Sequence, residues 1–137
     1  MLRRNQKVEL IRKAPLFAHC SKRELEQIAQ IADEIDLSKG KEMTRQGSRG
    51  REFFVLLEGD ADVDKDGRRI NTLGPGDFFG EIALVSDTPR TATVTATSPV
   101  RALVITDRSF KRLLKDIPEI QAKVLSALAE RLAPELV

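Results

Sequence analysis

Tryptophan and tyrosine are absent from the 137-residue sequence, and its six aromatic side chains are all phenylalanine. Proteins that hold single-stranded nucleic acid stack the bases on exposed aromatic rings, so this scarcity argues against such a surface. The charges nearly cancel, since 23 basic and 21 acidic side chains give a net charge of +2. The sequence therefore lacks the concentrated basic stripe of a DNA-binding protein, and we expect no direct nucleic-acid binding.

Cysteine and histidine occur once each, as Cys20 and His19. A single cysteine excludes an intramolecular disulfide and fits a reducing compartment. A single histidine excludes a metal site built from several histidines, and we expect neither a metal nor a cofactor. We interpret Cys20 as a small, partly buried residue near a helix start and His19 as a surface or turn residue.

Long apolar runs are also missing, and none approaches the about 20 residues that cross a bilayer. The N-terminal sequence MLRRNQKVEL is charged and lacks the apolar stretch of a secretory signal. We therefore expect a cytoplasmic protein without membrane contact. Hydrophobic residues still make up 41% of the chain, which is enough for an ordered core. With no internal repeat or low-complexity linker, residues 1–137 are predicted to form a single domain.

Helical patterns occupy the N-terminal part of the chain, over residues 4–30. Residues 4–13 carry an apolar stripe among charges, which is typical of a short helix, and Pro15 is predicted to stop it. Ser21, followed three residues later by Glu24, forms a capping box that predicts the start of a second helix.

A second pair of helices is predicted at the C-terminal end, over about residues 107–133. Asp107 is the predicted N-cap of the first helix, and Pro118 suits the first position of the second. Pro134 is predicted to end that helix. Its apolar stripe at four-residue spacing is formed by Ile120, Val124, Leu128 and Leu132.

Between about residues 33 and 106, short apolar or alternating runs are separated by glycine-containing turns. FFVLLEGDADVDKDGRRINTL predicts three strands with EGD and KDGR as turns. TATVTATSPVRALVIT predicts two more strands, separated at Pro99. We therefore predict an α+β fold, an antiparallel β-roll of jelly-roll type with seven or eight strands, flanked by N-terminal and C-terminal helices.

The segment GDFFGEIALVSDTPRTATV, residues 76–94, places two charged residues among apolar and small ones. Gly80 has no side chain, so the backbone there can approach a ligand closely. Residues 81–84 are predicted to form one helical turn, whose N–H groups and dipole attract an anion. Arg90, nine residues after Glu81, presents paired donors that match phosphate oxygens.

Two interpretations of Glu81 and Arg90 remain open from this chemistry. A carboxylate is a good acceptor for a sugar hydroxyl, and a phosphate together with a hydroxyl suggests a nucleotide. The alternative is a ligand-free ion pair between Glu81 and Arg90 inside a loop, because such pairs occur and add little net stability.

The sequence FGEIALVSDTPRTATV resembles the phosphate-binding cassette of cyclic nucleotide-binding domains, in which F-G-E-[IL]-A-L precedes a short loop and P-R-[AST]-A-[TS]-V. Upstream, RQGSRGREFFVLLEGDADV resembles the glycine-punctuated strands of that family, with Gly47 and Gly59 at the turns. Downstream, VRALVITDRSFKRLL resembles its final strand and following helix. The resemblance runs from about residue 14 to residue 130 and implies a cyclic nucleotide as ligand.

The resemblance also implies roles for six residues. Arg90 would bind the oxygens of the cyclic phosphate, and Glu81 would accept a hydrogen bond from the ribose 2′-hydroxyl. Backbone N–H groups that would contact ribose or phosphate belong to Gly80, Ile82, Ala83 and Thr91.

The identity of the base is less determined by the resemblance. In that family a threonine after the arginine often accompanies guanine recognition, so Thr91 permits cyclic GMP, although it also suits a plain strand residue. We expect cyclic AMP as the ligand, with a cGMP-selective module as the alternative. Leu128, Leu132 or another aliphatic side chain is expected to cover the base. Arg49 and Arg51 replace residues that are often acidic in that family, which we expect to alter only a surface turn.

No nucleophile and base are arranged for catalysis in the sequence, so we expect a non-enzymatic regulatory module. Ligand binding is expected to repack the C-terminal helices and to act on a protein partner or an output domain. The alternatives are a sensor fragment of a larger transcription regulator, kinase or channel, and a domain with another ligand. The apolar stripe of the last helix offers a surface for a homodimer, with packing on the chain's own barrel as the alternative.

Overall fold

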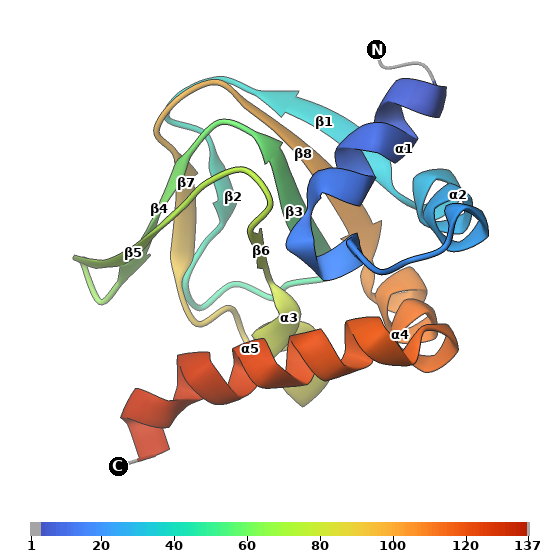
Figure 1. Cartoon of the computed structure of the whole chain (residues 1–137). Helices are drawn as coiled ribbons and strands as arrows, with labels where there is room; N and C mark the ends of the chain where they lie inside the picture. Colours follow the sequence, from blue (N-terminus) through green and yellow to red (C-terminus); the bar gives the residue numbers. More distant parts are fainter. Residues whose placement is uncertain (1–3, 137) are drawn as a thin grey trace.

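Two antiparallel sheets of four strands each form the body of the structure (Figure 1). The computed structural model describes the backbone of residues 4–136 and the side chains of residues 5–84 and 87–131. One sheet has the strand order β1-β8-β3-β6 and the other the order β2-β7-β4-β5, so the predicted antiparallel β-roll is confirmed. The strands are β1 (Asp33–Leu37), β2 (Glu42–Thr44), β3 (Glu52–Glu58), β4 (Ala61–Lys65), β5 (Arg68–Leu73), β6 (Phe78–Phe79), β7 (Thr93–Ala96) and β8 (Val100–Thr106).

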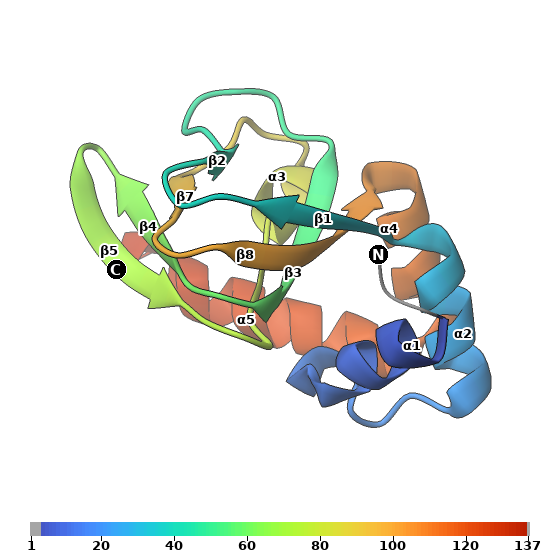
Figure 2. The same ribbon diagram turned by 90° about the horizontal axis from the view of Figure 1, so that it is seen from above.

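The helices flank this roll as the sequence predicts. Helices α1, α2 and α4 gather at one end of the sheets, and the β4–β5 hairpin lies at the other end (Figures 1 and 2). Helix α5 runs from α4 toward that hairpin and passes α3 on its way (Figure 1). The helices are α1 (Arg4–Lys13), the 3₁₀ helix η1 (Pro15–Phe17), α2 (Lys22–Ile31), α3 (Glu81–Ser86), α4 (Asp107–Asp116) and α5 (Pro118–Leu136).

Side-chain caps set the starts of α2 and α4. The predicted capping box is confirmed, because Ser21 Oγ accepts from Glu24 N at 3.1 Å and Glu24 Oε1 accepts from Ser21 N at 2.8 Å. In α4 the cap is Thr106, whose Oγ1 accepts from Ser109 N at 3.3 Å. The prediction of Asp107 as N-cap is therefore wrong by one residue, since the last residue of β8 already has the extended backbone that a cap needs.

Helix α5 begins at Pro118, as predicted, but it does not end at Pro134. It continues to Leu136, so the predicted end is wrong. A proline inside a helix removes one i→i−4 hydrogen bond, and Pro134 stands in the last turn, where few such bonds remain.

The apolar stripe of α5 packs against the chain itself. Ile120 and Val124 are buried, and Leu128 is partly buried against the same core cluster. The side chain of Leu132, the fourth member of the stripe, lies outside the described residues. The alternative of packing on the chain's own barrel is therefore confirmed for Ile120 and Val124, and these two residues offer no exposed surface for a homodimer.

Strand β3 is buried on both of its faces. Phe53, Val55 and Leu57 point toward the helices, whereas Phe54 and Leu56 point into the space between the two sheets. Side chains alternate across a strand, so a strand covered on both sides has a continuous apolar sequence, here FFVLL. The strand thus belongs to two separate core clusters and fixes the helical layer to the roll.

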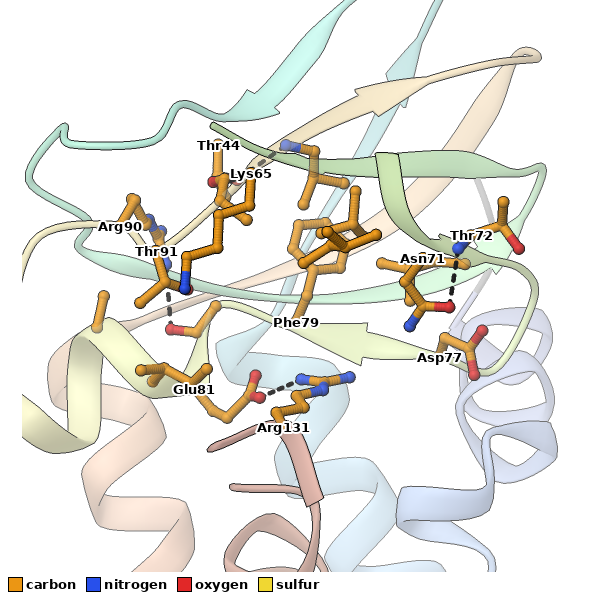
Figure 3. A pocket seen from close by; sticks show the side chains of 18 of the residues that line it. Thr44, Lys65, Asn71, Thr72, Asp77, Phe79, Glu81, Arg90, Thr91 and Arg131 are labelled. Atoms are coloured by element: carbon orange, nitrogen blue, oxygen red, sulfur yellow. Dashed lines mark hydrogen bonds and ion pairs between the residues drawn. The ribbon is translucent and has the colours of Figure 1, made fainter. Parts of the chain in front are cut away.

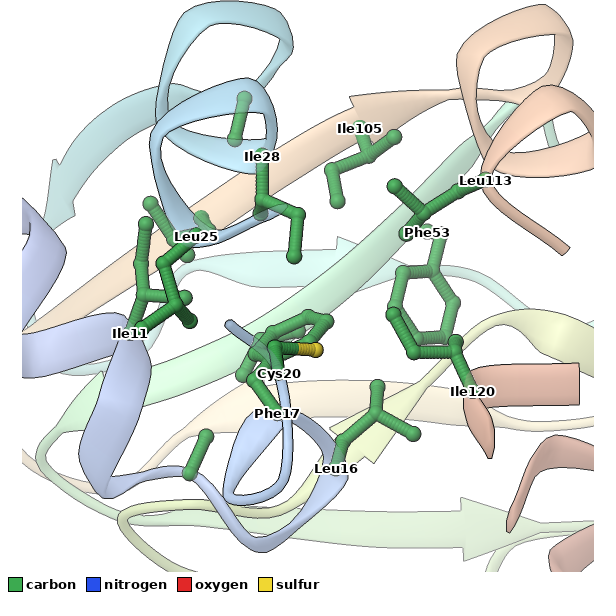
Figure 4. Packing of buried hydrophobic residues seen from close by; sticks show 14 of the residues in the cluster. Ile11, Leu16, Phe17, Cys20, Leu25, Ile28, Phe53, Ile105, Leu113 and Ile120 are labelled. Carbon is green, nitrogen blue, oxygen red and sulfur yellow. The ribbon is translucent and has the colours of Figure 1, made fainter. Parts of the chain in front are cut away.

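The larger cluster joins the helices to the outer face of the first sheet (Figure 4). Ile11 from α1, Leu25 from α2 and Ile120 from α5 are fully buried there. Phe53 stacks on Phe110 of α4, with the ring centroids 4.4 Å apart. Each of these helices therefore contributes to one continuous core, whose burial supplies most of the driving force for packing them on the sheet.

Replacing Phe53 with alanine is expected to lower the free energy of unfolding by about 3–5 kcal/mol, because it empties a fully buried site between β3 and α4. Urea unfolding followed by circular dichroism measures this loss. Ile70→Ala is the matched control, since Ile70 is 60% exposed and its truncation should change stability by less than about 0.5 kcal/mol. Equal losses for both variants would contradict the described core.

Candidate functional site

A pocket of about 790 Å³ is lined by three parts of the chain (Figure 3). These are the sheet β2-β7-β4-β5, helix α5, and the segment that follows β6. Sequence reasoning missed several lining residues that come from other elements, among them Thr44, Lys65, Asn71 and Arg131. These residues are distant in sequence from the glycine-rich segment, and only the folded chain brings them to it. All six residues predicted for the site line this pocket, namely Gly80, Glu81, Ile82, Ala83, Arg90 and Thr91.

Gly80 is the N-cap of α3 and has a left-handed backbone, with φ of +97°. A Cβ atom at this position would lie 2.8 Å from Arg90 Nη1 and 2.9 Å from the Glu52 carbonyl oxygen. Glycine is therefore required twice, once for the backbone conformation and once for the close approach of the arginine. The helical turn predicted for residues 81–84 is confirmed as the start of α3.

Arg90 is 6% exposed and lies at one end of the pocket. Its guanidinium donates from Nη1 to the Gly80 carbonyl at 3.0 Å and from Nη2 to the Glu52 carbonyl at 2.7 Å. It also lies over the Phe54 ring, with Cζ 5.9 Å from the centroid. Both hydrogen bonds go to neutral carbonyls, so the positive charge remains available to an anion.

Burial lowers the pKa of the Arg90 guanidinium from its ordinary value, and the charges of Glu52 and Glu81 oppose that shift. The direction reflects the cost of holding a cation away from water. An anion that enters the pocket would relieve this cost, because it would supply the opposite charge that the two carbonyl dipoles replace only in part.

The loop before β3 holds Arg90 from its other side. Gly47 N donates to the Arg90 carbonyl and Arg90 N donates to the Ser48 carbonyl, each at 2.8 Å. A Cβ atom on Gly50 would lie 2.0 Å from Arg90 Nε, so this glycine makes room for the side chain. Sequence reasoning treated this loop as a surface turn and missed Gly50, because a glycine that only clears space for a distant residue leaves no local pattern.

Glu81 is fully buried, with 0% of its surface exposed. Its Oε1 accepts a hydrogen bond from Arg131 Nη1 on α5. Arg131 Nη2 donates to the Phe78 carbonyl at 2.6 Å, and the guanidinium lies 5.1 Å from the centroid of the Phe78 ring. Glu81 Oε2 has no hydrogen-bond partner in the part of the chain that the structure describes.

The ligand-free alternative, an internal ion pair between Glu81 and Arg90, is wrong. Glu81 pairs with Arg131, while Arg90 donates to two carbonyls. Sequence reasoning missed Arg131, because the prediction for α5 is based on its apolar stripe and not on its charged residues. The available signal was indirect, since a carboxylate buried among apolar residues requires a cation from elsewhere.

The remaining uncharged side chains predicted for the site are those of Thr91, Ile82 and Ala83. Thr91 is half-buried, and Ile82 and Ala83 belong to the first turn of α3. The α5 residues on the pocket wall include Glu130 and Arg131, whereas Leu128 packs against the larger core cluster. The side chain of Leu132 is outside the described residues, so the expected aliphatic cover over the base finds no support from Leu128.

Within the described part of the chain, no group of three or more His, Cys, Asp or Glu side chains is placed to hold a metal ion. None of the helices in the same part of the chain is both long and apolar enough to cross a bilayer.

The chain belongs to the cyclic nucleotide-binding domain family, whose model matches residues 34–116. That segment contains the roll except for the first residue of β1, the loop that holds Arg90, and all six predicted site residues. The resemblance inferred from the sequence is therefore confirmed at the level of the family.

Two curated relatives are kinase components. The chain is 38% identical over 109 residues to a cAMP-dependent protein kinase regulatory subunit from Mycosarcoma maydis, covering 73% of this chain and 21% of that protein. It is 34% identical over 128 residues to the cGMP-dependent protein kinase egl-4 from Caenorhabditis briggsae, covering 88% of this chain and 17% of that protein. The chain thus spans about a fifth of the length of these relatives.

A solved structure described as Sp-2Cl-cAMPS bound to PKAR CBD2 has the same fold, with a TM-score of 0.84 and 27% sequence identity. The match covers 98% of this chain and 92% of that one. The helices at both ends therefore take part in the likeness together with the roll.

Gly50→Ala is expected to weaken cyclic nucleotide binding by tenfold or more, about 1.4 kcal/mol, because its Cβ would force the Arg90 guanidinium to move. Isothermal titration calorimetry with cyclic AMP measures the change. Gly74→Ala is the control, since its Cβ would meet only Asp60 Oδ1 at an ordinary 3.4 Å and its backbone is not left-handed. Unchanged affinity in Gly50→Ala would show that Arg90 tolerates displacement.

Proposed function

We propose that this chain is a regulatory sensor that binds cyclic AMP in the pocket and transmits binding to its C-terminal helices. One observation carries the proposal. A buried guanidinium with carbonyl partners and a buried carboxylate with a bare oxygen, Arg90 and Glu81, line the same pocket. These two groups match the two polar parts of a cyclic nucleotide, its phosphate and its ribose hydroxyl.

The phosphate is proposed to bind at Arg90. A guanidinium has five N–H donors, and the hydrogen bonds to the Gly80 and Glu52 carbonyls leave others for the ligand. The N–H groups of the first turn of α3, including those of Ile82 and Ala83, would add donors and a favourable dipole. A charge-assisted hydrogen bond of this kind contributes about 1.5–3 kcal/mol.

The ribose is proposed to bind at Glu81. Its bare Oε2 would accept a hydrogen bond from the 2′-hydroxyl, which satisfies a buried acceptor that otherwise costs free energy. Because Oε1 is already paired with Arg131, the negative charge of Glu81 is balanced when a phosphate binds nearby.

The base is proposed to be adenine, with guanine as a second candidate. Adenine is supported by the cyclic AMP named in the first of the two kinase relatives and by the Sp-2Cl-cAMPS named in the solved structure. Guanine is supported by the position of Thr91 on the pocket wall, where its hydroxyl would reach a base turned over the sugar, and by the cGMP-dependent relative.

The output is proposed to pass through α4 and α5 without any catalysis by this chain. Helix α5 reaches the pocket through Glu130 and Arg131, and α4 packs on β3 through Phe110, so a ligand that prefers one arrangement of these helices would shift their populations. Since the relatives are kinase components, a kinase is the partner class that the comparisons favour. A transcription regulator or a channel remains the alternative output.

Arg90→Ala is expected to lower the affinity for cyclic AMP by roughly ten- to several hundred-fold, since it removes the buried cation facing the phosphate. Calorimetric titration of wild type and variant tests this. Arg45→Ala is the control, because Arg45 is an exposed arginine that pairs with Glu42 and does not line the pocket. Failure of the wild type to bind either cyclic AMP or cyclic GMP would overturn the proposed function.

Thr91→Ala is expected to weaken cyclic GMP binding by about threefold or more while leaving cyclic AMP binding within about twofold, because only guanine would use the hydroxyl. Titrating both nucleotides into both proteins measures the selectivity. A wild type that binds cyclic GMP the more tightly would replace adenine with guanine in the proposal.

A further inference from the structure

Gln46 lies in the loop between β2 and β3, and its side chain reaches the turn of the β4–β5 hairpin. Nε2 of Gln46 donates to Asp66 Oδ1, and Oε1 accepts from Asp66 N, each at 2.8 Å. The Gln46 backbone N donates to Thr93 Oγ1 on β7 at 2.9 Å. Because both side-chain hydrogen bonds run to one residue, they fix the orientation of the turn as well as its distance from the loop.

The turn that Gln46 holds has a defined backbone. Asp66 and Gly67 both have positive φ, 54° and 77°, which is the pattern of a type I′ turn between two strands. Lys65 and Arg68, the residues on either side, are paired across the two strands. The turn therefore has little freedom of its own, and holding Asp66 also holds the adjoining ends of β4 and β5.

The hairpin forms one wall of the pocket. Strand β5 is the last strand of its sheet and pairs with β4. Figure 3 shows Lys65 and Asn71 on these strands, across the pocket from Glu81 and Arg131. Ile70 lines the pocket while 60% of it is exposed, so burial does little to hold this wall in place near the turn. The hydrogen bonds at the turn therefore set how closely the wall approaches a ligand.

The loop that carries Gln46 also holds the arginine of the site. Gly47 N donates to the Arg90 carbonyl, and the Ser48 carbonyl accepts from Arg90 N, each at 2.8 Å. Residues 46, 47 and 48 thus bind the hairpin and the arginine in succession. Because each residue has only two soft backbone torsions, a shift at one end of so short a segment moves the other end. The loop therefore connects one wall of the pocket to its buried cation.

We propose that Gln46 is a positioning residue, which holds the β4–β5 hairpin against the base of the nucleotide while the phosphate lies on Arg90. The inference rests on the proposed function and deepens it, because it adds a determinant of base binding outside residues 76–94. It also couples the two ends of the ligand. A phosphate on Arg90 stabilises the loop that holds the hairpin, so the base meets a wall that is already in place.

The test separates the base from the rest of the ligand. Competition calorimetry measures the affinities for cyclic AMP and for a ribose 3′,5′-cyclic phosphate that carries no base, and their ratio gives the contribution of the base. Gln46→Glu removes the donor to Asp66 and brings two carboxylates together, so the hairpin is released. The ratio is expected to fall by about fivefold or more, through weaker binding of cyclic AMP, with the affinity for the ligand without a base nearly unchanged.

An exchange of the two side-chain groups is expected to restore the ratio. Asp66→Asn keeps an acceptor for Gln46 Nε2 and tolerates the left-handed backbone, so it should leave the ratio within about twofold of wild type. In the double variant, Gln46→Glu with Asp66→Asn, the introduced amide donates to the introduced carboxylate, and the backbone N at position 66 keeps its acceptor. Recovery to within about twofold of the wild-type ratio is the expected result.

Two controls separate positioning from general effects of the substitution. Gln27→Glu makes the same change at an exposed position of α2 and should keep the wild-type ratio. Thermal unfolding without ligand checks that Gln46→Glu is folded. If it is not, Gln46→Ala removes both side-chain hydrogen bonds without adding a charge, and the ratio is expected to fall by about threefold or more.

An unchanged ratio in Gln46→Glu would overturn the inference. Equal losses of affinity for the two ligands would also overturn it, because Gln46 would then act only through the loop around Arg90. Failure of the exchanged pair to restore the ratio would do the same, since the hydrogen bonds to Asp66 would not be the cause. A wild type that binds neither cyclic AMP nor cyclic GMP overturns the proposed function as well, whereas binding of cyclic AMP with any of the first three results overturns only the role of Gln46.

Discussion

The guanidinium of Arg90 is a buried cation held by backbone carbonyls, and the geometry of the site depends on it. It binds the carbonyl of Glu52 at the start of β3 and that of Gly80 at the turn into α3. Gly50 and Gly80 are both in contact range of the same group, and any side chain there would displace it. One side chain thus fixes the relative positions of β3 with the loop before it and of the short helix α3, which lies more than twenty residues further along the chain.

The site contains a negative side chain, Glu81, and two positive ones, Arg90 and Arg131, and the three come from different parts of the chain. Arg90 follows the loop after α3, Glu81 begins α3, and Arg131 comes from α5. A buried carboxylate close to a bound phosphate would repel it, and the pairing of Glu81 with Arg131 removes most of that repulsion. The same pairing connects the pocket to the last helix, so the element that balances the charge is also the element proposed to carry the output.

Sequence reasoning predicts those parts of the structure that local patterns determine. The capping box of Ser21 and the helical turn after Gly80 follow from residues within a few positions of each other. The displaced cap at Thr106 and the continuation of α5 through Pro134 show the error in such patterns, which is of one to three residues when neighbouring caps or weak last turns compete.

The parts that could not be predicted depend on contacts between distant residues. Glu81 and Arg131 are fifty positions apart, and the clearance at Gly50 concerns a side chain forty positions away. The family resemblance assigned roles within the cassette, but it supplied no partner for the carboxylate from outside it. Burial of a charge predicts that a partner exists, whereas only the packing of α5 determines which residue it is.

The aromatic contacts beneath α5 give this arrangement a mechanical property. The guanidinium of Arg131 lies over the Phe78 ring. The centroid of that ring is 5.6 Å from the centroid of the Phe53 ring, and Phe53 in turn stacks on Phe110 of α4. Rings packed at interior density have little free volume, so they resist compression and shift as a group. We therefore expect a displacement of the Arg131 guanidinium by a fraction of an ångström to shift these rings and, with them, α4.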